Sequence, residues 1–219
     1  MLKEDHEALP PEQRLALSYT RPDLRPALAS FFALDRRFGQ IVAKTSEPVM
    51  GQMRLAWWRE QLEKPVGDRP AGDFLLDAVS QYWAGQEEGM VSLVDGWEEV
   101  LVVDNLTHAE AKRFCSSRAR PLALLAARCG SGAGVRAQAA GERWAAADAA
   151  VHVSSDDERE VLLATGLGRT SGKGGIPRSM RGLAVLEALA LRSMRRGGRP
   201  LMDGRGAALI ALRAGLLGR

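Results

Sequence analysis

Residues 22–42 read PDLRPALASFFALDRRFGQIV, and this stretch decides the fold class. Its large apolar side chains recur at spacings of mostly three and four residues, which is the period of one face of an α-helix. They are Leu24, Leu28, Phe31, Phe32, Leu34, Phe38 and Ile41. Pro22 suits the first turn of a helix, because that position needs no backbone N–H. We therefore predict an amphipathic helix over residues 22–42.

Two further segments have the same helical period. Residues 48–62 bring Met50, Met53 and Trp57 onto one stripe, and residues 176–196 form another. No alternation of period two, which would indicate a strand, extends beyond a few residues. We predict a single bundle of about eight to ten helices. Its interior should contain Leu28, Phe32, Met53, Trp57, Leu124, Leu183 and Leu189.

The composition also favours an all-α domain. The chain has 219 residues, of which 46% are hydrophobic and 26% charged, so it can bury a real core and disorder is not expected. Aromatic residues make up only 5%, and the strand formers Ile, Thr and Tyr are scarce, whereas Leu, Ala and Arg are abundant. We expect one all-α helical domain over residues 1–219.

The sequence has the features of a cytoplasmic protein. Its longest apolar runs, residues 122–127 and 207–212, are far shorter than the roughly 20 residues that a membrane span needs. The N-terminal segment is acidic and has two prolines at residues 10–11, unlike a secretory signal. Cys115 and Cys129 are fourteen residues apart in one helix-like segment, too far for a disulfide, so we expect reduced, buried thiols.

The charge is distributed unevenly. Residues 160–219 carry eleven Arg or Lys against three Asp or Glu, a net of +8, whereas residues 1–159 carry a net of −5. Such a basic end suits an anionic partner, although a solvated surface also explains it. Aromatic residues concentrate in the acidic half, which counts against nucleic-acid binding. We expect weak association with an anionic membrane surface through Arg178, Arg181, Arg192, Arg195, Arg196 and Arg199.

Several enzyme classes lack their motifs here. Residues 172–173 are Gly-Lys, but the glycine and the Ser or Thr that complete a nucleotide-binding P-loop are missing. The histidines His6, His108 and His152 form no close cluster with one another or with cysteine, so a zinc site lacks its usual ligand spacing. No GxSxG hydrolase motif is present.

Two motifs within residues 17–62 identify a family. The pattern R-x-A-L-x-A-L-Y-A-F-x-R is matched at Arg25, Ala27, Leu28, Ala33 and Arg36, with Phe32 and Leu34 at its Tyr and Phe positions. The pattern R-L-x-W-W-R is matched at Arg54, Leu55, Trp57, Trp58 and Arg59. In order and spacing the stretch resembles squalene and phytoene synthases. This resemblance implies an all-helical bundle of the isoprenoid (terpenoid) synthase type, in a family that acts on prenyl diphosphates.

The magnesium-binding motifs of that family are degenerate in this chain. The positions of its first motif, DDIVD, fall on Gly39, Gln40, Ile41, Val42 and Ala43, so every carboxylate is missing. In the family these carboxylates hold the magnesium ions that neutralise the diphosphate leaving group. The two aspartates of the second motif fall on His152 and Asp156, although Asp148 and Asp157 keep some acidity nearby. We expect no catalytic residues, no metal site and no cofactor, with magnesium needed only if activity persists.

The resemblance leaves two functions open. The first is a non-catalytic family member, truncated relative to active synthases, that binds an isoprenoid or another lipid. The chain is also similar to the phytoene-synthase-like mitochondrial complex I assembly factor, which implies an assembly role with a protein partner, peripheral at the inner membrane. The second is an active prenyl transferase acting on prenyl diphosphates. Family position implies ligand-binding roles for Phe32, Arg36, Trp58, His152 and Asp156.

Overall fold

The structure is a computed structural model, and it describes residues 9–103, 105–171 and 174–218. Over these residues the chain forms α-helices and one short 3-10 helix, Val66–Asp68, and no strand. The α-helices are α2 (Pro11–Ser18), α3 (Arg25–Lys44), α4 (Pro48–Glu63), α5 (Phe74–Tyr82), α6 (Glu87–Val102), α7 (His108–Ala127), α8 (Ala133–His152), α9 (Asp156–Gly168), α10 (Arg181–Arg195) and α11 (Gly206–Leu217). The predicted all-α fold class is confirmed.

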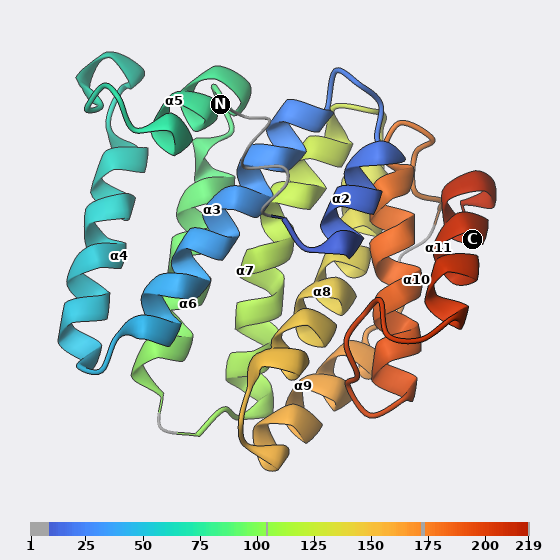
Figure 1. Ribbon diagram of the computed structural model, residues 1–219. Helices are drawn as coiled ribbons and strands as arrows, with labels where there is room; N and C mark the ends of the chain where they lie inside the picture. Colours follow the sequence, from blue (N-terminus) through green and yellow to red (C-terminus); the bar gives the residue numbers. More distant parts are fainter. Residues whose placement is uncertain (1–8, 104, 172–173, 219) are drawn as a thin grey trace.

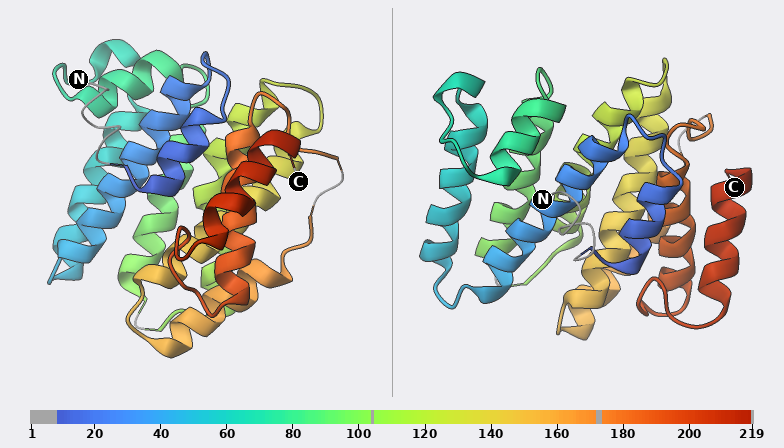
Figure 2. Two further views of the ribbon diagram at one scale, coloured as in Figure 1. Left: turned by 45° about the vertical axis from the view of Figure 1, so that its right-hand side comes forward. Right: turned by 45° about the horizontal axis from the view of Figure 1, so that its top comes forward.

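Six helices form a row in the order α4, α6, α7, α8, α10 and α11, each packed on the next (Figure 1). The helix α3 lies across this row and packs on α4, α5, α6 and α7, while α2 packs on α3 and α10. Of the two remaining helices, α5 lies at the top of the view and α9 at the bottom, against α7, α8 and α10 (Figures 1 and 2). The row thus leaves α4 and α11 at its two edges.

Proline positions shift the start of two predicted helices. The helix predicted from residue 22 begins at Arg25, because Pro26 is tolerated only in the first helical turn and would break a helix that began at Pro22. The helix predicted over residues 176–196 begins at Arg181, after a segment that contains Pro177. Both predicted helices therefore began several residues too early.

The core lies along α3, α7, α8 and α10. The rings of Phe31 and Phe32 pack edge-on against Trp144, with centroids 5.9 and 5.7 Å away. Of the predicted interior, Leu28, Phe32, Leu183 and Leu189 are buried and Leu124 is half-buried. Within the described ranges no helix is long and apolar enough to cross a membrane. Cys115 is buried, Cys129 is half-buried, and both are free.

The prediction was wrong for Met53 and Trp57, which are exposed. Both belong to α4, an edge helix that is apolar on two faces. Its buried side consists of Gly51, Leu55, Trp58, Gln61 and Leu62. Because α4 packs mainly on α6, only one of its faces is covered, and the stripe chosen from the sequence is the uncovered one.

Candidate functional site

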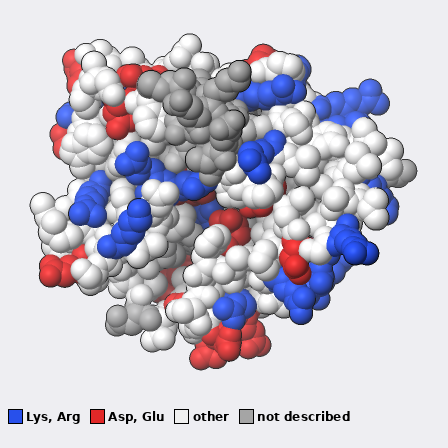
Figure 3. Space-filling view, in the orientation of Figure 1, with Lys and Arg blue, Asp and Glu red and all other residues white. Residues whose placement is uncertain are grey.

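A cavity of about 520 Å³ lies between α3, α6, α7 and α8, with residues of α2 and α9 at its edge. Small-molecule sites in proteins have volumes of roughly 300 to 1,000 Å³. In the space-filling view, acidic atoms lie deep in a hollow between α3 and α8, and basic side chains border it (Figure 3). The wall on the α6 side is apolar and includes Val100, Val103 and Leu106.

Arg118 extends from α7 to this cavity and meets carboxylates from two other helices. Its Nε and Nη2 atoms donate to Asp35 Oδ1 and Oδ2 at 2.9 and 2.5 Å. Nη2 also donates to Asp148 Oδ2 at 2.8 Å, and Nη1 donates to the Ala145 carbonyl oxygen at 3.2 Å. Trp97 Nε1 donates a further hydrogen bond to Asp35 Oδ1 at 2.8 Å. One guanidinium thus connects α3, α7 and α8.

The Arg118 charge is held in an apolar environment. The side chains of Arg118 and Asp35 are each 2% exposed. The guanidinium carbon lies 4.8 to 5.3 Å from the ring centroids of Trp97, Phe114 and Trp144. Burial by itself lowers the pKa of Arg118, but the charges of Asp35 and Asp148 outweigh burial and raise it. The guanidinium therefore stays protonated and acts as a permanent cation between two carboxylates.

Trp97 fills the space beside the first degenerate motif. A Cβ atom on Gly39 would lie 3.1 and 3.3 Å from two carbons of the Trp97 ring, so the glycine allows this close packing. The same ring packs edge-on against Phe114, with centroids 5.1 Å apart. An aspartate at position 39 would need Trp97 to move. The small residue at position 39 and the indole beside it therefore depend on each other.

Most of the motif positions named from the resemblance lie at this cavity. Gly39, Gln40 and Ala43 from α3 line the cavity, and His152 lines it from the last turn of α8. Asp148, one turn before His152, also lines it. The helices α3 and α8 thus bring Gly39, Gln40, Ala43, Asp148 and His152 to one cavity. Between them this chain offers a glycine, an amide, an alanine, a histidine and carboxylates held by Arg118.

The predicted ligand-binding residues divide into two groups. Arg36 and His152 line the cavity. Asp156 does not, because α8 ends before it; its side chain is 93% exposed and pairs with Arg159. The structure instead brings Asp148 and His152 to the cavity on successive turns of one helix.

Phe32 and Trp58 lie in the core and not among the residues that line the cavity. Phe32 packs on Trp144, and Trp58 packs edge-on against Phe38 with centroids 5.6 Å apart. In the second sequence motif Arg59 pairs with Asp95 and Glu98 of α6. These residues of the two motifs stabilise helix packing in this chain.

The polar edge of the cavity offers hydrogen-bond acceptors. Gln13 is 2% exposed, and its Oε1 atom has no hydrogen-bond partner among the described residues. His152 Nδ1 lies 2.7 Å from the Asp148 carbonyl oxygen. A carbonyl oxygen only accepts, so Nδ1 carries the proton of this hydrogen bond. In the neutral imidazole Nε2 is then the acceptor. Burial raises the pKa of the nearby Glu12 carboxyl, and Asp148 raises it further, although a backbone hydrogen bond and His152 oppose this.

The donor set of the cavity does not fit a magnesium site. Magnesium prefers carboxylate and water oxygens in octahedral geometry. Asp35 and Asp148 already accept hydrogen bonds from Arg118, and Gly39 and Ala43 offer no side-chain oxygen. In the part of the chain that the structure describes, no three His, Cys, Asp or Glu side chains lie close enough together to hold a metal ion.

Sequence reasoning missed Asp35, Arg118 and Trp97, yet two signals were present. Asp35 lies four residues after Phe31 and three before Phe38, so it belongs to the buried face of its helix. Arg118 lies four residues after Phe114 and four before Leu122, also on a buried face. A buried acid and a buried base on separate helices need partners, and each is the partner of the other.

The helical bundle and its cavity between α3 and α8 define an all-α protein of the isoprenoid synthase type. The squalene/phytoene synthase family pattern matches residues 12–156. The chain therefore belongs to the squalene/phytoene synthase family. No curated protein and no solved structure matches it. The matched residues include both helices that face each other across the cavity, whereas α10 and α11 lie outside them.

Proposed function

We propose that this protein is a non-catalytic member of its family that holds an isoprenoid lipid in the cavity without magnesium. The observation that carries the proposal is the Arg118 guanidinium between Asp35 and Asp148. It takes up the two carboxylates that α3 and α8 still bring to the cavity. Without a metal, the departing diphosphate of a prenyl substrate would lose its main electrostatic stabilisation.

The charges of the cavity favour a ligand with an uncharged polar end. Three carboxylates line it, those of Asp35, Asp148 and Glu158, against the two guanidinium groups of Arg36 and Arg118. A diphosphate would add negative charge to a site that has no positive excess. The acceptor atoms Gln13 Oε1 and His152 Nε2 suit a hydroxyl donor. An isoprenoid alcohol, with its chain along Val100 and Val103, meets both conditions.

Equilibrium binding of farnesol and farnesyl diphosphate, each with and without magnesium, tests the proposal. We expect farnesol to bind more tightly than farnesyl diphosphate, with no effect of magnesium and no diphosphate release. Ala149→Phe, which fills the cavity from α8, should weaken binding at least tenfold, whereas the matched change Ala56→Phe on the exposed side of α4 should not.

The same experiment contains the results that overturn the proposal. Steady release of diphosphate with magnesium would favour the alternative, an active prenyl transferase acting on prenyl diphosphates. Tighter binding of farnesyl diphosphate without metal would contradict the preference for an uncharged end. Absence of binding by both compounds would remove the lipid-binding role and leave the assembly-factor-like role with a protein partner, which stays a prediction from the family resemblance.

A further inference from the structure

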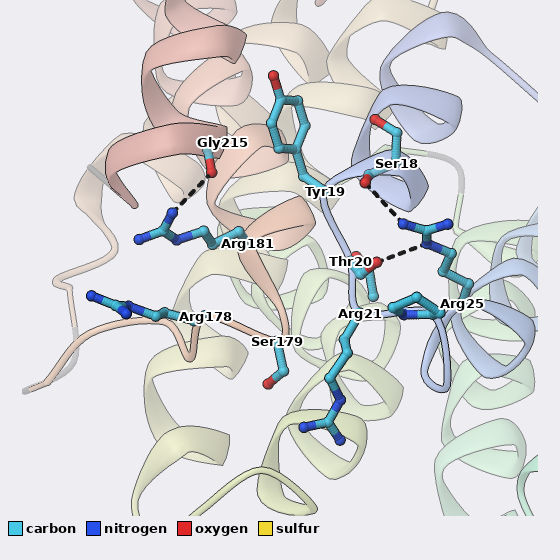
Figure 4. A pocket seen from close by; sticks show the side chains of 10 residues that line it. Ser18, Tyr19, Thr20, Arg21, Arg25, Arg178, Ser179, Arg181 and Gly215 are labelled. Carbon is cyan, nitrogen blue, oxygen red and sulfur yellow. Dashed lines mark hydrogen bonds between the residues drawn. The ribbon is translucent and has the colours of Figure 1, made fainter.

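A second pocket, of about 530 Å³, lies at the other end of α3 from the degenerate motif (Figure 4). It is formed by the loop between α2 and α3, the segment that leads into α10, and the end of α11. Four arginines line it and no carboxylate does. They are Arg21, Arg25, Arg178 and Arg181.

The walls of this pocket are clamped together. Arg21 N donates to the Ser179 carbonyl oxygen at 2.9 Å, and Thr20 and Met180 form an isolated antiparallel bridge. Gly182 lets α10 approach α2 so closely that a Cβ atom there would lie 1.9 Å from the Ala16 carbonyl oxygen. The arginines are therefore carried on two segments whose relative position is set by the fold.

Two of the arginines are oriented without being neutralised. Arg25 donates from Nε to the Thr20 carbonyl at 2.8 Å, and Arg181 donates to the Gly215 carbonyl at 3.4 Å and to that of Leu216. Carbonyl groups carry no net charge, so these guanidinium groups stay cationic and keep donors for a ligand.

The other two arginines differ from each other. Arg21 pairs with Asp23 at 2.5 and 2.7 Å, and both side chains are more than half exposed. Arg178 is exposed and has no hydrogen bond or ion pair among the described residues. Of the four guanidinium groups, only that of Arg21 pairs with a carboxylate among the described residues. The planar guanidinium group binds phosphate oxygens through two parallel hydrogen bonds.

The helix α11, which ends at this pocket, has its large side chains on the outside. Its buried residues are the small ones, Ala207, Ala211, Ala214 and Gly215. Its leucines point outward, with exposed fractions of 70% for Leu209, 47% for Leu212, 56% for Leu216 and 59% for Leu217. Helix α11 lies at the edge of the row and packs on α10 (Figure 1). A helix that exposes four leucines is expected to have a partner on that face.

Charge identifies the partner. Arg213 is exposed on α11, Arg205 is exposed at its N-terminal end, and Arg178 and Arg181 line the pocket at its C-terminal end. A second copy of this surface would bring like charges together. An anionic bilayer offers both phosphate groups and an apolar interior. The helix α10 offers no comparable apolar surface, because Met180 and Leu183 are buried in the core. The exposed apolar residues are those of α11.

We propose that α11 and the arginine pocket form a docking surface for an anionic phospholipid membrane. The leucines of α11 enter the interfacial region, and the pocket arginines bind the phosphate of a lipid headgroup. This surface is separate from the cavity between α3 and α8, so it does not depend on which ligand that cavity holds.

Flotation of the full chain with vesicles tests this surface. We expect retention on phosphatidylcholine vesicles that contain phosphatidylglycerol, loss of retention at raised salt, and little retention on phosphatidylcholine alone. Arg178→Gln should lower the partition coefficient about fivefold, the effect of one basic residue near an anionic surface. Leu212→Ser with Leu216→Ser should lower it further. Arg178 and both leucines are exposed, so these variants should fold, which thermal unfolding checks.

Matched controls decide whether the effect belongs to this surface. Arg37→Gln, an exposed arginine on α3, and Val49→Ser with Met53→Ser, an exposed apolar pair on α4, should leave retention unchanged. Equal loss in these controls, equal retention on neutral and anionic vesicles, or retention on neither would each overturn the proposal. Stabilisation by inorganic phosphate without vesicle binding would show a soluble phosphate site instead and would also overturn it.

Discussion

Arg118 and Asp35 form a two-point ion pair at 2.9 and 2.5 Å, although they are 83 residues apart in the chain. The pair is almost completely buried. A buried ion pair adds little net stability compared with apolar residues of the same shape, but removal of one partner leaves a charge without compensation. Removal of one partner should therefore lower the free energy of unfolding far more than the intact pair raises it.

Arg118→Met should lower the free energy of unfolding by about 3 to 5 kcal/mol, because Asp35 and Asp148 would lose their buried partner. Urea unfolding at neutral pH measures the change. Arg120→Met is the matched control, since Arg120 is exposed and pairs with the exposed Glu88; its loss should stay below about 1 kcal/mol. Equal losses in both variants would contradict the role of Arg118.

Magnesium should not change the thermal midpoint of the protein. Gly39, Gln40 and Ala43 offer one neutral amide where a hard cation needs carboxylates, and Arg118 occupies the two nearest acids. Thermal unfolding with and without magnesium in the millimolar range checks this. A clear rise of the midpoint that disappears in Gln40→Ala would mean that this site binds the metal after all.

Gly182→Ala should destabilise the protein by about 3 kcal/mol or more, since its Cβ would overlap the backbone of α2 and the backbone cannot yield as a side chain can. The control is Gly168→Ala at the end of α9, where an added Cβ meets nothing within 4 Å. Urea unfolding of both variants measures the difference. A small loss in Gly182→Ala would indicate that α2 and α10 can separate.

How far the sequence predicts this molecule depends on the element. The fold class follows from the spacing of apolar residues in α3, and the cavity helices follow from the family resemblance. The helices at the edges of the row, α4 and α11, could not be read correctly, because apolar residues on both faces do not show which face is covered. Arg118, Asp35 and Asp148 come from three helices, and their ion pairs become visible only when the helices are packed.

The two cysteines should differ in reactivity. Burial raises the pKa of the Cys115 thiol to about 12, and the nearby Arg118 only partly opposes this. The thiolate is the reactive form, so iodoacetamide should label the half-buried Cys129 in the native protein and spare Cys115 until the chain unfolds. Mass spectrometry of tryptic peptides, with Cys129→Ala as the control, measures both sites. Native labelling of Cys115 in that control would contradict the burial.

The raised pKa of Cys115 also makes the free energy of unfolding fall at high pH. The folded state holds the Cys115 proton more tightly than the unfolded state, whose thiol has the ordinary pKa of 9.0. The stabilisation is therefore complete below about pH 9 and is lost as the pH rises toward about 12. In Cys115→Ala this loss should be absent, so the free energies of unfolding of the two proteins should converge between neutral pH and about pH 11. A difference that stays constant over that range would show that the thiol ionises equally in both states.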